Sequence, residues 1–128
     1  MIFVAHPTTP ANTPSSSPLL TSIPIVAGKI TRIQIFFPPG VNALAHLKIL
    51  WGLYQIFPSN EQGDFAGGDV LLEWDEDIDI SFEPLQLTAV TWNEDDTYPH
   101  TITVQVIMTP ASGATDTGTV IQQLLSGG

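Results

Sequence analysis

The chain has 128 residues, of which 43% are hydrophobic and 12% are charged, and its formal net charge at pH 7 is −10. This length corresponds to one domain, and ordinary soluble domains contain about 25% charged residues, roughly twice as many as this chain. The three cations, Lys29, Arg32 and Lys48, are too few to neutralise a phosphate backbone or an anionic membrane surface. We therefore expect neither a nucleic-acid nor a membrane partner.

Two further classes are disfavoured by simple counts. The chain has no cysteine, which excludes a disulfide framework and a thiolate metal site. No stretch reaches the roughly 18 apolar residues that span a bilayer. The N-terminus lacks a basic region followed by a long apolar run, so it does not resemble a signal peptide.

The first 28 residues differ in composition from the rest. Residues 2–5 are apolar and predict a short strand, and residues 6–28 are rich in Pro, Ser and Thr, with five of the eleven prolines and no Asp, Glu, Lys or Arg. Prolines cannot donate ladder hydrogen bonds, so this tract predicts an extended N-terminal arm over residues 1–28. We expect the strand, with Ile2, Phe3 and Val4, to complete the sheet edge of another subunit.

Residues 29–128 are expected to form the folded domain. Alternation of apolar and polar residues, or a short apolar run, predicts strands over residues 29–37, 45–57, 69–74, 77–83, 85–92 and 100–108. Gly52, inside the second of these, suggests a β-bulge or the close approach of another backbone. Residues 110–118 read as a loop and residues 119–125 as a final short strand or a helical turn. About seven or eight short strands with turn signals between them predict an all-β fold, an antiparallel β-sandwich or jelly roll.

Twelve of the thirteen acidic residues lie between Glu61 and Asp96. Carboxylates grouped in loops are the usual ligands of Ca²⁺, and the candidates here are Asp75, Asp77, Asp79, Glu94, Asp95 and Asp96. Neither group has the glycine and the distal glutamate of an EF-hand loop. The sequence favours a solvated strand face and an acidic hairpin tip, so we expect no metal and no cofactor.

No pattern indicates catalysis. The neighbouring acids do not suggest two carboxyls facing each other across a cleft, as glycoside hydrolysis requires. The three histidines, His6, His46 and His100, fall on separate predicted segments and favour structural roles. A nucleophile elbow and a phosphate-binding glycine loop are also missing from the sequence, so we expect a protein that is not an enzyme.

The most distinctive loop is residues 92–100, WNEDDTYPH. Its Asn and Asp side chains favour tight turns, and Pro99 fixes the entry to the next strand. Trp92 and Tyr98 flank the loop and are expected to clamp it. The sequence is consistent with a well-specified connector and with a contact loop for a neighbouring subunit or a glycan.

Three segments carry a resemblance: GKITRIQIFFPPG, LKILWGLYQIFPSN and WNEDDTYPHTITVQV, which together cover much of residues 28–108. In order and texture they resemble the small β-sandwich structural proteins of tailed phages and related viruses. The resemblance implies a virion component, such as a minor capsid, decoration or head–tail protein, that assembles with copies of itself and with other virion proteins. It implies no catalytic residue.

Two alternatives stay open. One is a subunit of an extracellular filament that polymerises by strand donation. The other is a carbohydrate-binding or adhesive β-sandwich at an extracellular surface, which would use Trp51, Trp74, Trp92 and the acidic loops, with or without Ca²⁺.

Overall fold

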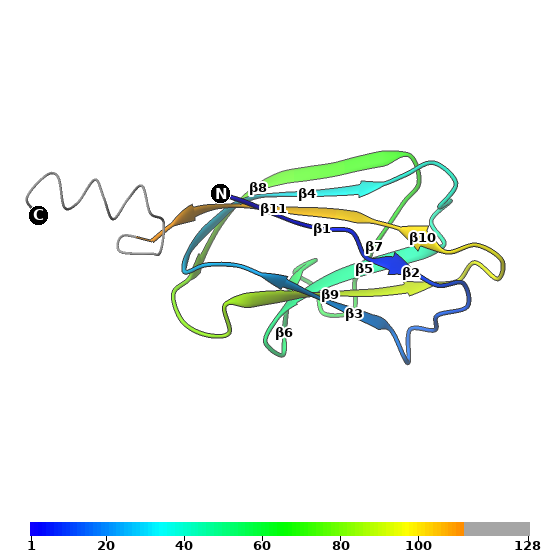
Figure 1. Cartoon of the computed structure of the whole chain (residues 1–128), viewed down its shortest axis with the longest axis horizontal. Helices are drawn as coiled ribbons and strands as arrows, with labels where there is room; N and C mark the ends of the chain where they lie inside the picture. The colour runs from blue at the N-terminus through cyan, green and yellow to red at the C-terminus, as the bar shows by residue number, and fades with distance from the viewer. Residues whose placement is uncertain (112–128) are drawn as a thin grey trace, which may run out of the picture.

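The computed structural model describes residues 1–111, which contain eleven strands and no helix. Nine of the strands form two sheets that pack face to face (Figure 1), and the other two form a small two-stranded sheet. All strand pairs are antiparallel. The antiparallel β-sandwich predicted from the sequence is therefore confirmed. There are more strands than the seven or eight expected, because the N-terminal residues form strands and three strands are only two residues long.

One sheet has four strands in the order β1 (Ile2–Ala5), β11 (Thr103–Pro110), β4 (Gly28–Phe37) and β8 (Val70–Ile80). The other has the order β3 (Leu19–Pro24), β9 (Gln86–Asn93), β5 (Ala45–Trp51) and β6 (Tyr54–Phe57), with β7 (Phe65–Ala66) also paired to β5. At one end of the sandwich, β2 (Thr8–Thr9) pairs with β10 (His100–Thr101).

The core lies between the two sheets and follows the period-2 pattern of the sequence. In β4, Ile33, Ile35 and Phe37 are fully buried, while Arg32 and Gln34 face outward. Leu47 and Ile49 of β5 are buried against them from the opposite sheet. Because one face of each strand is apolar, the hydrophobic effect fixes which face turns inward.

The strand expected over residues 45–57 is two strands. Gly52 has φ +61° and lies in a two-residue turn with Leu53, so Trp51 pairs with Tyr54 across a tight hairpin. A left-handed conformation at a hairpin turn suits glycine, which has no Cβ to clash. The glycine therefore marks a reversal of the chain instead of the predicted bulge within one strand.

Conversely, the strands expected over residues 69–74 and 77–83 form one strand, β8. Its side chains alternate without a break from Val70 to Ile80, and its acidic residues face outward except for Glu76. The acidic run does not interrupt the strand, because Lys29 and Arg32 of the neighbouring strand β4 lie opposite Asp79 and Asp75.

The structure does not show the extended arm expected over residues 1–28. Ile2–Ala5 pair with β11 of the same chain, and Leu19–Pro24 pair with β9. Four of the five prolines lie between strands, and Pro24 is the last residue of the edge strand β3, so none interrupts a ladder. The tract is ordered because the distant strands β9 and β11 supply its hydrogen bonds.

The predicted element at residues 119–125 lies outside the described residues, as does most of the predicted loop 110–118. Within residues 1–111, no helix has the length and apolar character needed to cross a membrane.

Candidate functional site

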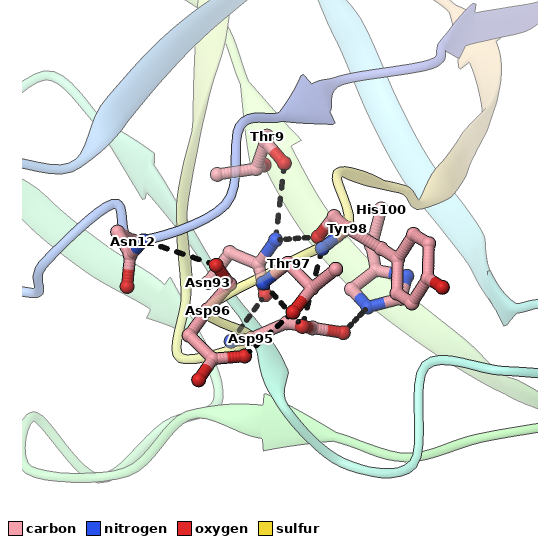
Figure 2. A network of polar contacts seen from close by, with 8 residues as sticks. All are labelled: Thr9, Asn12, Asn93, Asp95, Asp96, Thr97, Tyr98 and His100. Atoms are coloured by element: carbon pink, nitrogen blue, oxygen red, sulfur yellow. Dashed lines mark hydrogen bonds and ion pairs between the residues drawn. The ribbon is translucent and has the colours of Figure 1, made fainter.

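One end of the sandwich carries a connected polar network around the loop from Glu94 to Pro99 (Figure 2). Its centre is Asn93, the last residue of β9, which is 1% exposed. The Asn93 amide donates hydrogen bonds to the backbone carbonyls of Thr9 at 3.2 Å and Tyr98 at 2.9 Å. Its Oδ1 accepts one from the backbone N–H of Asp95 at 2.9 Å. One buried side chain thus joins the N-terminal segment to the loop.

Asp95 closes the loop from the other side. Its carboxylate accepts hydrogen bonds from the backbone N–H groups of Thr97 and Tyr98, at 2.9 and 3.2 Å, and lies 2.8 Å from Nε2 of His100. The backbone hydrogen bond from Thr97 is the largest of the effects that lower the pKa of Asp95, followed by the bonds from His100 and Tyr98. Asp95 is therefore an ionised turn residue whose oxygens are already engaged.

His46 makes a second connection beside this loop. Its Nδ1 lies 2.5 Å from Asp64 and its Nε2 lies 3.0 Å from Glu94. Burial opposes protonation of His46, but the hydrogen bonds to Glu94 and Asp64 outweigh it and raise the pKa. When it is protonated, the His46 ring has a donor on each nitrogen, and it links β5 to the loop before β7 and to the loop after β9.

Trp92 packs on this connection. Its ring is stacked on His46, with centroids 5.1 Å apart and planes inclined by 3°, and Lys48 Nζ lies 5.8 Å from the Trp92 ring centroid. Tyr98 accepts the Asn93 hydrogen bond through its backbone, while its side chain is exposed. Of the two predicted contact residues in this loop, Trp92 is engaged within the chain and Tyr98 is available to a partner.

The six candidate calcium ligands fall into two groups on different parts of the sandwich. Asp75, Asp77 and Asp79 face outward from β8, and Glu94, Asp95 and Asp96 lie in the loop after β9. Arg32 pairs with Asp75 at 2.6 Å and with Glu73 at 3.0 Å, and Lys29 pairs with Asp77 at 2.8 Å. Among residues 1–111, no group of three or more His, Asp or Glu side chains is arranged to hold a metal ion.

The predicted interface residues of the N-terminus lie on β1, at the edge of the four-stranded sheet. Phe3 pairs with Val106 of β11 and packs against the core, whereas Ile2 and Val4 face outward and are exposed. The terminal ammonium group donates to the carbonyl of Met108 at 2.8 Å. β1 is therefore an edge strand held by its own chain, with one apolar face open.

The other end of the sandwich carries an apolar patch that sequence reasoning missed. We define the apolar patch by its members on the β5–β6 hairpin and the β8–β9 loop: Trp51, Leu53, Tyr54, Phe82, Pro84 and Leu85. Leu53 is 97% exposed, Tyr54 77% and Phe82 66%. The rings of Trp51 and Phe82 have centroids 5.2 Å apart, and Trp51 Nε1 donates to the Pro84 carbonyl at 2.8 Å.

The patch was missed because strict alternation assigned Leu53 and Phe82 to the inward faces of strands. The hairpin at Gly52 and the end of β8 at Ile80 instead place both side chains on turns. The sequence signal that could have predicted the patch is Gly52, because a turn at this glycine would place its neighbours Trp51 and Leu53 at the end of a hairpin.

Comparisons of the chain with protein-family models, with curated proteins and with solved structures find no match.

Proposed function

We propose that this chain is a structural subunit of a virion, a minor capsid, decoration or head–tail component, that acts by assembling with copies of itself and with other virion proteins. The apolar patch carries the proposal. Single exposed apolar side chains are ordinary, but a contiguous group of large ones marks an interaction surface. Burying the patch against another protein removes apolar area from water at about 25 cal/mol per Å².

The polar end of the sandwich supports the same function. Asn93, Asp95 and His46 brace the loops there through hydrogen bonds that are satisfied within the chain. Braced loops lose little conformational entropy when they bind a neighbour, which favours a subunit that docks as a rigid body. Tyr98 is the exposed aromatic side chain on this surface. The virion setting itself comes from the resemblance over residues 28–108.

Strand donation in a filament is the second candidate, and the position of β1 favours it. β1 has four residues and lies at a sheet edge, where β11 is its neighbour in the sheet. Exchange of β1 between copies would keep the same hydrogen bonds, as in domain swapping. Both candidates are assembly functions, and both predict a multimer.

The carbohydrate-binding alternative has less support, because the three tryptophans are engaged within the chain. Trp51 packs on Phe82, Trp74 contacts Phe57 and Phe65, and Trp92 stacks on His46. A sugar-binding platform needs an open aromatic face. Trp74 in particular packs against the core.

Light scattering coupled to size exclusion tests the proposal on the full chain. We expect a multimer at micromolar concentration and a shift toward the monomer in the variant Leu53→Asp, since a charge in the patch would have to be buried. Leu20→Asp is the control, because Leu20 is also an exposed leucine, at 63%, but lies on β3, away from the patch. A monomeric parent chain, or equal effects of the two substitutions, would contradict the proposal.

Deletion of residues 1–24 is not a clean test of assembly. It would remove β1 and β3 from the two sheets, and with β3 it would remove Ile23, which is buried in the core. Point substitutions in the patch leave both sheets intact, so a change in mass reports on the interface.

A further inference from the structure

The described chain ends on the same end of the sandwich as the apolar patch. The backbone N–H of Ala111 donates to the Ala27 carbonyl at 3.0 Å, and the N–H of Ile25 donates to the carbonyl of the patch residue Leu85 at 3.1 Å. Two short backbone contacts therefore connect the patch to the point where residues 112–128 begin.

The sequence of residues 112–128 contains one compact apolar group. Val120, Ile121, Leu124 and Leu125 follow a stretch of small and polar residues, SGATDTG, and are followed by Ser-Gly-Gly. Seven residues between Ala111 and Thr119 span at most about 25 Å when extended. That reach is enough to bring the apolar group to a surface beside the end of the sandwich.

Charge restricts where two copies can meet. Each chain carries a net charge of −10, so copies repel one another, and an interface is favoured where both surfaces lack acids. The six patch residues are uncharged, and the only acid after Ala111 is Asp116. Glu83 is exposed between the patch residues Phe82 and Pro84, but the patch residues themselves are uncharged, as are residues 120–125, so the two surfaces match in apolar character.

We propose that residues 120–125 of one copy dock on the apolar patch of a second copy. This inference rests on the proposed function and names the partner of the patch. The two surfaces differ, so the contact is head-to-tail: it closes into a ring if the rotation between copies allows it and otherwise continues as a filament.

The absence of cysteine in the chain makes a direct test simple. Two full-length single variants, Leu53→Cys and Leu124→Cys, are mixed, oxidised and analysed on a non-reducing gel and by mass spectrometry of the linked peptides. We expect a disulfide between position 53 of one copy and position 124 of the other. Leu20→Cys mixed with Leu124→Cys is the control, and it should give little of the mixed product.

The double variant Leu53→Cys/Leu124→Cys distinguishes docking between copies from docking within one chain. Docking between copies gives a series of covalent multimers, which supports the proposal. A chain closed on itself as a monomer, or no preference over the Leu20→Cys control, overturns it.

The mass of the parent chain separates this inference from the proposed function. A multimer without the 53–124 disulfide overturns the tail contact and leaves the assembly function standing. A monomeric parent chain overturns both. Ile121→Asp gives an independent check: it should lower the multimer mass as Leu53→Asp does, and an unchanged mass contradicts the inference.

Discussion

Replacement of Asn93 by alanine should cost more stability than any other polar truncation in the loop network. The side chain is almost completely buried and makes three hydrogen bonds, two donated to Thr9 and Tyr98 and one accepted from Asp95. The variant removes the hydrogen bonds that Asn93 makes with two backbone carbonyls and one backbone N–H. Thr9 is also buried, so water cannot easily reach the carbonyl that faces the lost amide.

The magnitude follows from the number of groups and their burial. An unsatisfied buried acceptor costs about 1–3 kcal/mol, and each of the two partly buried bonds contributes about 0.5–1.5 kcal/mol net. Asn93→Ala should therefore lower the free energy of unfolding by about 2–6 kcal/mol. Against a typical total of about 5–15 kcal/mol, this is a large fraction.

Urea unfolding followed by tryptophan fluorescence measures this change. If the slope of the unfolding free energy against urea concentration is the same as in the parent, the folded state of the variant is still compact. Thr97→Ala is the control, since it removes one exposed side-chain hydrogen bond to Asp96 and keeps the backbone bond to Asp95. We expect it to cost less than about 0.5 kcal/mol. If Asn93→Ala cost no more than Thr97→Ala, the idea that Asn93 joins the N-terminal segment to the loop would be refuted.

Two further predictions concern the polar and the apolar end. The pKa of His46 is raised on folding, so its stabilising contribution is complete below the unfolded pKa of about 6.5 and is lost as pH rises through the folded pKa. The free energy of unfolding of the parent chain should fall over this pH range, and His46→Gln should remove that fall. A variant with the same pH profile as the parent would contradict the link from His46 to Asp64 and Glu94. Gly28→Ala should destabilise the fold by roughly 1–3 kcal/mol, because a Cβ at this position would lie 2.3 Å from the Thr109 carbonyl oxygen. Thermal unfolding measures this change, and a midpoint equal to that of the parent would show that β4 and β11 can move apart at this point without cost.

The alternation of apolar residues was sufficient to predict an antiparallel sandwich, because the side chains of a half-buried strand must obey it. The same rule placed Leu53 and Phe82 wrongly, since alternation holds within a strand and says little about where the strand ends. β8 shows the converse error: its acidic run looks like a break, yet Arg32 and Lys29 on the neighbouring strand make it a regular face.

Contacts between residues far apart in the chain could not be predicted from the sequence. Residues 1–28 have the composition of an arm, and they become strands because β11 and β9 lie next to them. The partners of His46 are equally remote, at Asp64 and Glu94. Local composition therefore predicted the turn chemistry of residues 93–99 but not the side chains that the turn brings together.

The most direct test of the account is the solution mass of the full chain by light scattering, measured beside Leu53→Asp and Leu20→Asp. The account predicts a multimer for the parent and for Leu20→Asp, and a smaller species for Leu53→Asp. A strict monomer for all three would contradict an assembly function built on the apolar patch.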